Sequence, residues 1–162
     1  MSESTYARPI SHVGLTVRDV QNALEWYGDV LGFEELSAPY TVERGDEEWG
    51  YVSTVLDLEF DRVTIAHMTT TNDVGFELFG FANSPEGPSS IRATGFNHVG
   101  VVDPDIEELA ERIDREGGRH LSPIRERVEG GPRLTYCADP WDNRVEIYTQ
   151  SHGRVLTAIG RD

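Results

Sequence analysis

A histidine-led phrase occurs twice in this sequence. HVGLTVRDV begins at His12 and HVGVVDPDI begins at His98, so the offset is 98 − 12 = 86 residues. Histidine, valine, glycine and aspartate recur in the same order in both phrases. A chain of 162 residues can form one core or two small halves, but not two independent domains of ordinary size. We therefore expect an internal duplication within a single domain that spans residues 1–162.

Both phrases predict a strand followed by a helix. Each begins with a short alternating apolar run and then reaches an aspartate that precedes a helical pattern. Asp19 and Asp105 are predicted N-caps, and Glu108 completes a capping-box pattern with Asp105. The predicted helices cover about 20–31, ended by Gly32, and about 106–116, ended by Gly117 and Gly118.

Segments rich in β-branched and aromatic residues follow each helix and predict strands. In the first half they are FEELSAPYTVE, RVTIAHMT and VGFELFGF, with YVSTVLDLE between them as a strand or a short helix. In the second half they are RHLSPIRERV, PRLTYCAD and NRVEIYT. The sequence thus predicts an α+β fold of two tandem βαβββ modules. Their expected bounds are 8–82 and 91–150, with a linker at 83–90 around SPEGPSS and a C-terminal tail at 151–162.

Composition excludes several classes of function. A net charge of −15 disfavours binding to nucleic acid or to an anionic membrane. All 14 basic residues are arginine, so Schiff-base lysine chemistry and a lysine-dependent phosphate loop are excluded. The single cysteine, Cys137, excludes an internal disulfide and a cysteine-rich metal site. The acidic, lysine-free composition also suggests a host with a salty cytoplasm.

The N-terminus, MSESTYARPIS, has neither a basic nor an apolar leader segment. No apolar run approaches the roughly 18 residues that cross a bilayer. We therefore expect a cytoplasmic protein.

Each half closes with one carboxylate inside an apolar strand: Glu77 in GFELF and Glu146 in RVEIY. Strand alternation places each glutamate on the face opposite its apolar neighbours. An unpaired buried carboxylate is costly, so each is expected to face solvent, pair with a base or bind a metal. If the first and last strands of each half lie side by side, His12 approaches Glu77 and His98 approaches Glu146.

Two imidazoles and two carboxylates at duplicated positions predict one divalent metal site. Zn²⁺, Ni²⁺, Co²⁺, Mn²⁺ and Fe²⁺ all accept such ligands, and four of them leave positions free for water or substrate. A lone strand histidine is usually structural and a lone strand glutamate usually points to water. The duplication of both favours the metal site.

Other residues are weaker candidates. His67 could line the site with Tyr136 as an additional pocket residue, although an exposed strand histidine is the simpler interpretation of His67. Trp26 and Tyr27 lie on an apolar helix face and are expected in the core. His120 and His152 are expected to be solvated. The first half is longer between its histidine and glutamate by 65 − 48 = 17 residues, which include Trp49 and Tyr51 and could form a lid or wall.

The quoted motifs resemble the vicinal oxygen chelate superfamily. SHVGLTV, NALEWYGDVLGFE, FELFG, NHVGV and DPWDNRVEIY carry the resemblance, which covers about 10–149. The superfamily includes glyoxalase I, methylmalonyl-CoA epimerase, extradiol dioxygenases and bleomycin-resistance proteins. The resemblance implies paired modules that form a cup-shaped mixed sheet around a metal, and it implies a homodimer. Asp142 departs from the family's DPxGN turn, where glycine is usual, and a left-handed aspartate is tolerable there.

Within that superfamily the ligand pattern favours glyoxalase I chemistry. Glyoxalase I resembles this chain in using a histidine and a glutamate from each module, here His12, Glu77, His98 and Glu146. The resemblance implies a metal-dependent lyase or isomerase that removes a proton next to the carbonyl of an α-oxygenated small-molecule substrate, through a metal-bound enediolate. Glu146 is the preferred catalytic base and Glu77 the second candidate.

Two other functions stay open. An extradiol-type dioxygenase would hold Fe²⁺ with His12, His98 and Glu146 alone. A drug- or metabolite-binding protein without catalysis would bind its ligand in the same cup-shaped sheet.

Overall fold

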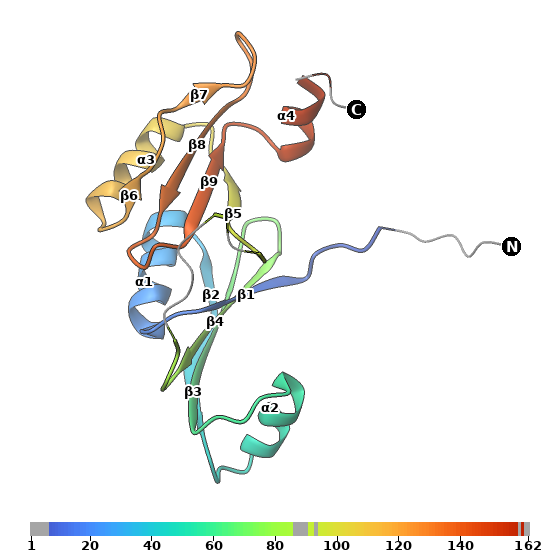
Figure 1. The fold of residues 1–162 in the computed structure, drawn as a ribbon, viewed down its shortest axis with the longest axis vertical. Helices are drawn as coiled ribbons and strands as arrows, with labels where there is room; N and C mark the ends of the chain where they lie inside the picture. The colour runs from blue at the N-terminus through green and yellow to red at the C-terminus, as the bar shows by residue number, and fades with distance from the viewer. Residues whose placement is uncertain (1–6, 86–90, 93, 159, 161–162) are drawn as a thin grey trace, which may run out of the picture. The chain divides into compact units, whose positions relative to one another are not determined.

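The computed structural model describes residues 7–85, 91–92, 94–158 and 160. The chain divides into two compact units, Met1–Pro85 and Glu86–Asp162, each built on one sheet (Figure 1). Of the predicted linker 83–90, residues 86–90 lie outside the described residues. Among the described helices, none is both long and apolar enough to cross a bilayer.

The first unit is a four-stranded mixed sheet with two helices. Its strand order is β1-β4-β3-β2, with β1 parallel to β4 and the other neighbours antiparallel. The predicted strands all form, and YVSTVLDLE belongs to a helix rather than a strand. The elements are β1 (His12–Thr16), α1 (Val20–Leu31), β2 (Glu34–Glu43), α2 (Trp49–Leu56), β3 (Arg62–Thr69) and β4 (Gly75–Phe81).

The second unit repeats the plan with a broken second strand. Its order is β5-β9-β8-β6, with β5 parallel to β9 and β7 paired to β8. The predicted strand RHLSPIRERV forms only two short pieces, because the proline within it cannot donate a ladder hydrogen bond. The elements are β5 (Val99–Val102), α3 (Ile106–Arg115), β6 (Arg119–His120), β7 (Arg125–Glu126), β8 (Arg133–Ala138), β9 (Arg144–Tyr148) and α4 (His152–Ala158). Helix α4 lies in the segment expected as a tail, where no sequence pattern predicts it.

The caps of α1 agree with the prediction. The Asp19 carboxylate accepts a hydrogen bond from the Asn22 backbone N–H at 3.0 Å. At the other end Gly32 adopts φ 70°, and its N–H donates to the Gly28 carbonyl. This left-handed conformation favours glycine and ends the helix.

The capping box predicted at α3 is wrong. Asp105 is the N-cap residue, but its side chain makes no capping hydrogen bond. Its backbone N–H, the donor that Glu108 would need, already donates to the Asp103 carboxylate at 2.8 Å. Glu108 pairs instead with Arg112 at 3.0 Å, and the helix ends at Arg115, one residue before the predicted end.

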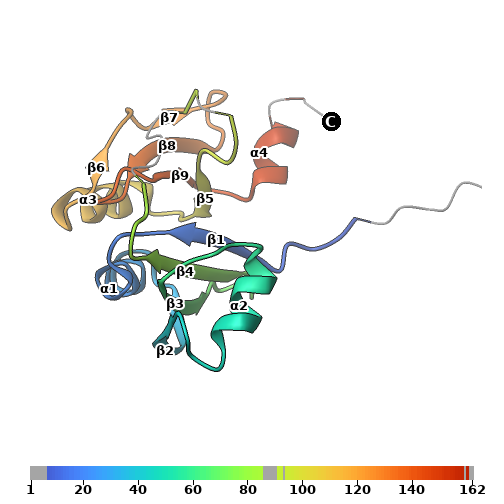
Figure 2. The same ribbon diagram turned by 60° about the horizontal axis from the view of Figure 1, so that its bottom comes forward.

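The two faces of the first sheet are covered by different helices. Helix α1 packs on one face, where Tyr27 contacts Phe76 with ring centroids 4.8 Å apart. Trp26 and Tyr27 are buried in this core, as predicted. Helix α2 lies on the opposite side of the sheet from α1 (Figure 2). It packs through Trp49 on an apolar cluster that contains Val42 and Val63.

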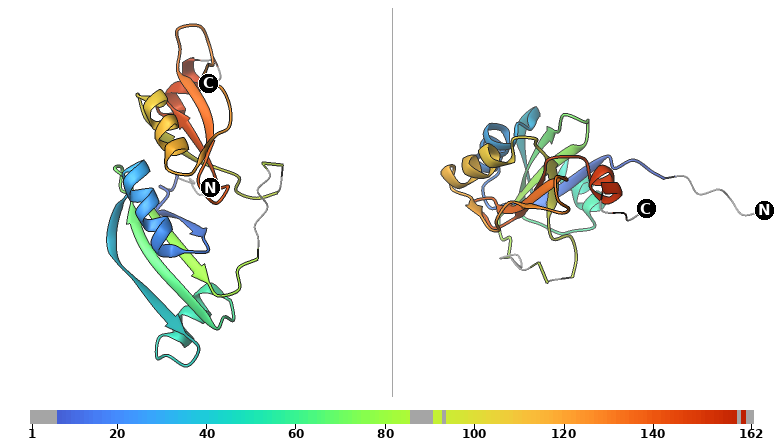
Figure 3. Two further views of the ribbon diagram at one scale, coloured as in Figure 1. Left: turned by 90° about the vertical axis from the view of Figure 1, so that its left-hand side faces the viewer. Right: turned by 90° about the horizontal axis from the view of Figure 1, so that it is seen from above.

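Each sheet therefore has one face that is not covered by α1 or α3, and a functional site can lie on that face. In the first unit, α2 packs on the apolar cluster of its face and lies toward one end of the long strands β2 and β3 (Figure 3, left). In the second unit α3 packs against β6 and β8. Val145 and Ile147 are fully buried, whereas Glu146 points to the other face by strand alternation.

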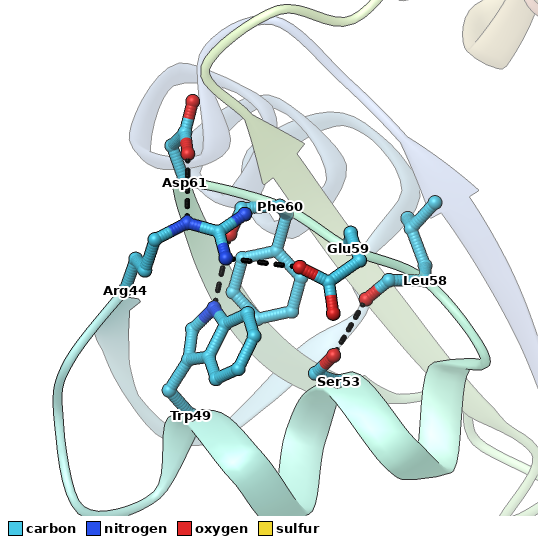
Figure 4. A network of polar contacts seen from close by, with 7 residues as sticks. All are labelled: Arg44, Trp49, Ser53, Leu58, Glu59, Phe60 and Asp61. Carbon is cyan, nitrogen blue, oxygen red and sulfur yellow. Dashed lines mark hydrogen bonds and ion pairs between the residues drawn. The ribbon is translucent and has the colours of Figure 1, made fainter.

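A polar network closes the segment that carries α2. Arg44 pairs with Glu59 at 2.9 Å and with Asp61 at 3.0 Å, and its guanidinium lies 4.7 Å from the centroid of the Trp49 ring (Figure 4). The Trp49 indole N–H donates to the Phe60 carbonyl at 2.9 Å. The carboxylates are exposed, so their ion pairs contribute little, whereas the half-buried indole bond and its packing contribute more.

We predict that Trp49→Phe lowers the free energy of unfolding by about 1–2 kcal/mol, because it leaves the Phe60 carbonyl without its donor. Glu59→Gln, which removes only an exposed charge, is expected to cost less than about 0.5 kcal/mol. Urea denaturation measures both changes in the free energy of unfolding. It is followed by circular dichroism, because tryptophan fluorescence would itself change in Trp49→Phe. Equal costs would contradict this account of the network.

Candidate metal centre

Parallel pairing of β1 with β4 brings His12 to Glu77. The register places His12 opposite Gly75 and Gly14 opposite Glu77. The His12 Nε2 atom lies 3.4 Å from Glu77 Oε2. The first histidine and glutamate of the sequence analysis are therefore neighbours on one face of the first sheet.

His67 lies on the other side of Glu77. It is the antiparallel partner of Glu77 across β3 and β4, and its Nδ1 atom is 3.3 Å from Glu77 Oε1. Each oxygen of this carboxylate thus faces an imidazole nitrogen. The interpretation of His67 as an exposed strand histidine is wrong, because antiparallel register places its half-buried side chain against Glu77. Tyr40 of β2 stacks on the His67 ring, with centroids 6.0 Å apart.

The second unit repeats the pair with a more buried carboxylate. His98, which directly precedes β5, has its Nε2 atom 3.2 Å from Glu146 Oε2. The Glu146 side chain is 9% exposed and that of Glu77 is 26% exposed. Burial of Glu146 makes an uncompensated charge there more costly than at Glu77.

Tyrosines complete the surroundings of Glu146. Tyr136 is its antiparallel partner across β8 and β9, and the Tyr136 ring lies edge-on to His98 at 5.5 Å. Burial raises the pKa of Tyr136, and the hydrogen bond of its hydroxyl to the Glu146 carboxylate raises that pKa further. Burial and the Glu146 charge also raise the pKa of Tyr148, which hydrogen-bonds Glu146 as well. Both phenols therefore stay protonated and act as donors to this carboxylate.

His67 and Tyr136, named from the sequence as additional pocket residues, occupy equivalent positions in the two halves. His67 precedes Glu77 by 77 − 67 = 10 residues, and Tyr136 precedes Glu146 by 146 − 136 = 10 residues. Both are direct cross-strand partners of their glutamate. The equal spacing in the sequence could have predicted this. Two antiparallel hairpins of equal length place His67 opposite Glu77 and Tyr136 opposite Glu146.

The remaining histidines lie elsewhere. The His120 Nε2 atom is 2.9 Å from Thr135 Oγ1, on the face of the second sheet away from Glu146. His152 is exposed on α4 as expected, with its ring 6.2 Å from that of Tyr148. Asp142 adopts φ 72° and pairs with Arg119, so an aspartate does occupy the left-handed turn position.

The His98 and Glu146 pair fits a cation on chemical grounds. The Nδ1 atom of His98 hydrogen-bonds the side-chain oxygen of Asn97, and an oxygen there requires an Nδ1–H donor. The Nε2 atom of a neutral imidazole then carries a lone pair, and it faces a carboxylate oxygen. Two acceptors at 3.2 Å repel unless a proton or a metal ion lies between them. Imidazole and carboxylate together are ligands that divalent first-row metals accept.

Neither unit forms a complete metal site on its own. Within the part of each unit that the structure describes, no three histidine, cysteine, aspartate or glutamate side chains are arranged to hold an ion. Each unit holds one histidine–glutamate pair.

Comparison with known proteins agrees with this fold. A model of the Glyoxalase/Bleomycin resistance protein/Dioxygenase superfamily matches residues 9–147. The chain belongs to this superfamily. The uncharacterized protein YwkD of Bacillus subtilis is 29% identical to this chain, over 88% of this chain and 98% of that protein. The 2-epi-5-epi-valiolone epimerase of an Actinomyces species is 26% identical over 85% of this chain and 77% of the epimerase.

Solved structures share the architecture. A glyoxalase family protein from Bacillus cereus superposes with a TM-score of 0.74, at 20% identity over 91% of this chain and 97% of the other. The Listeria monocytogenes fosfomycin resistance protein FosX, solved as an E126Q mutant with Mn(II) and dihydroxypropylphosphonic acid, gives a TM-score of 0.60 at 17% identity, over 95% and 99% of the two chains. These likenesses confirm the predicted fold class.

Gly75 lets His12 lie close to the backbone of β4, which leads to a prediction. A Cβ atom at Gly75 would lie 2.8 Å from the His12 Cβ atom. We expect Gly75→Ala to displace β1 and to lower the free energy of unfolding by about 1–3 kcal/mol.

Gly100 is the matched control, because no atom lies within 4 Å of a Cβ atom added there. Gly100→Ala is expected to change stability by less than about 1 kcal/mol. Urea denaturation of the two variants measures the difference. A Gly75→Ala variant as stable as wild type would show that β1 is not held at this spacing.

Proposed function

We propose that this protein is a metal-dependent lyase or isomerase of the glyoxalase I type. It would abstract a proton next to the carbonyl of an α-oxygenated small-molecule substrate. The observation that carries the proposal is the pair of matched contacts, His12 with Glu77 and His98 with Glu146, at duplicated positions. The similarity to an epimerase supports it, since inverting a carbon centre also requires proton removal.

In this proposal His12, Glu77, His98 and Glu146 hold one divalent ion, and the protein is a homodimer. When bound, the ion supplies a Lewis acid for two neighbouring substrate oxygens. Mn(II) in the FosX structure supports a divalent ion of this kind, and Zn²⁺, Ni²⁺, Co²⁺ and Fe²⁺ suit the same donors. Two histidines on separate units make the site depend on both units.

Glu146 is the proposed base. Its carboxylate is oriented by the Tyr136 and Tyr148 hydroxyls and by His98, so it is presented to a substrate in a fixed direction. Its buried position keeps water from competing for the transferred proton. Glu77, more exposed and held between His12 and His67, is the second candidate for that role.

Metal titration tests the shared site. After treatment with a chelator, the wild-type protein is expected to bind one equivalent of Ni²⁺, Zn²⁺ or Mn²⁺ per chain in calorimetry. His12→Ala and His98→Ala, in different units, should each weaken binding by at least about 10- to 100-fold. His120→Gln, which changes a histidine away from the site, serves as the control and should leave the affinity unchanged. Two equivalents per chain, or loss caused by only one of the alanine variants, would contradict a single shared ion.

Proton exchange tests the reaction. Metal-loaded protein is incubated in D₂O with hemithioacetals of 2-oxoaldehydes and with 2-substituted acyl thioesters, and deuterium at the carbon next to the carbonyl is followed by NMR. Glu146→Gln should reduce exchange by at least about 100-fold while metal binding remains. A Glu146→Gln variant that retains both metal and exchange would remove the assignment of the base.

A ring-cleaving Fe²⁺ dioxygenase is the second candidate function. One observation favours it: both oxygens of Glu77 already face imidazoles, His12 and His67. If that arrangement keeps Glu77 off the ion, His12, His98 and Glu146 form a two-histidine, one-carboxylate set, which is typical of non-haem Fe²⁺ oxygenases. Oxygen consumption by anaerobically Fe²⁺-loaded protein with catechols would decide for this function, and Glu77→Gln should then leave consumption within about threefold of wild type.

A further inference from the structure

The Arg144 side chain is placed beside the second histidine–glutamate pair without a partner of its own. Arg144 and Glu146 are two residues apart on β9, so both point to the face away from α3. Burial and Glu146 raise the pKa of Tyr136, and the Arg144 charge partly opposes them, as expected of a cation on the same side of the sheet. The cation thus lies on the same face as Glu146 and Tyr136.

One donor of the Arg144 guanidinium has no acceptor in the part of the protein that the structure describes. The Nε atom of Arg144 is buried and has no hydrogen-bond partner among the described residues. The structure shows no ion pair between Arg144 and a carboxylate of the described residues, although the chain carries 29 acidic residues. Arg112, Arg119 and Arg133 of the same unit each pair with a carboxylate, and Arg125 and Arg127 are exposed to water. A buried donor without an acceptor is costly, so an unpaired guanidinium at a candidate site indicates an acceptor that is not part of the protein.

The duplicated half has nothing equivalent. Gly75 stands two residues before Glu77, where Arg144 stands two residues before Glu146. Glycine is required in the first unit because a Cβ atom would meet His12 at 2.8 Å. The positive charge therefore occurs on only one side of the duplication, and it makes the two halves of the candidate site chemically different.

From this position we propose that Arg144 binds an anionic group of the substrate, a carboxylate or an oxyanion of similar geometry, next to the oxygens that the metal would hold. Guanidinium pairs with carboxylates through two parallel hydrogen bonds, and such bonds are about twice as strong as neutral ones. The inference rests on the proposed function, and it narrows the substrate class to α-oxygenated carbonyl compounds that also carry a negative charge.

Chelating probes test the inference by affinity rather than by turnover. Acetohydroxamate offers two neighbouring oxygens to a metal, the monohydroxamates of malonic and succinic acid add a carboxylate, and their amides replace it by a neutral group of similar shape. Calorimetry with Ni²⁺-loaded wild-type protein should show that the better carboxylate probe binds at least about tenfold more tightly than its amide. Arg144→Met should abolish that preference and leave the acetohydroxamate affinity within about twofold. Arg144→Lys should retain part of the preference for the carboxylate probe.

Arg112→Met is the matched control, because it removes the same charge from the same unit on α3, which packs on the other face of the sheet. It should keep the full preference. Thermal unfolding of each variant verifies that it is folded. Acetohydroxamate binding without a carboxylate preference, or a preference that survives Arg144→Met, would overturn the role of Arg144 and leave the metal site standing. Failure of every hydroxamate to bind would overturn the metal site and this inference together.

Discussion

Parallel pairing between the first and last strands of each unit is the constraint on which the candidate site depends. It is the contact that brings residues separated by 65 and 48 positions in the chain, His12 with Glu77 and His98 with Glu146, to within 3.4 and 3.2 Å. Parallel strands need a crossover, which begins with α1 in the first unit and with α3 in the second, and both helices pack on the opposite face of their sheet. Gly75 lets β1 approach closely in the first unit, so the spacing of the pair is set by backbone packing.

Duplication has produced two pairs with different surroundings. Glu77 lies between two imidazoles and remains partly open to solvent, whereas Glu146 is buried and receives hydrogen bonds from two phenols. The position two residues before each glutamate differs as well, glycine in one half and Arg144 in the other. A symmetric fold can therefore present an asymmetric set of groups, which suits a reaction in which one carboxylate accepts a proton and the other does not.

Much of this arrangement could be predicted from the sequence, and the failures have physical reasons. The α1 boundaries followed from Asp19 and Gly32, and the two pairs followed from strand alternation together with the duplication. The capping box at Asp105 failed because Asp103 competes for the same backbone donor, a contact that spacing alone does not reveal. The role of Arg144 could not be predicted. Strand alternation gives the face to which a side chain points, but not whether that side chain has a hydrogen-bond partner there.

The segment that carries α2 has a consequence for how such a protein diversifies. Its ends meet at the tip of the β2–β3 hairpin, where the Arg44 backbone N–H donates to the Asp61 carbonyl at 2.8 Å, and its polar network is made within residues 44–61. Because its polar contacts are made within the segment, residues 44–61 can be shortened, lengthened or replaced while β2 and β3 keep their pairing register. Natural variation can thus remodel the rim of the sheet without disturbing the strands that align the histidines and glutamates.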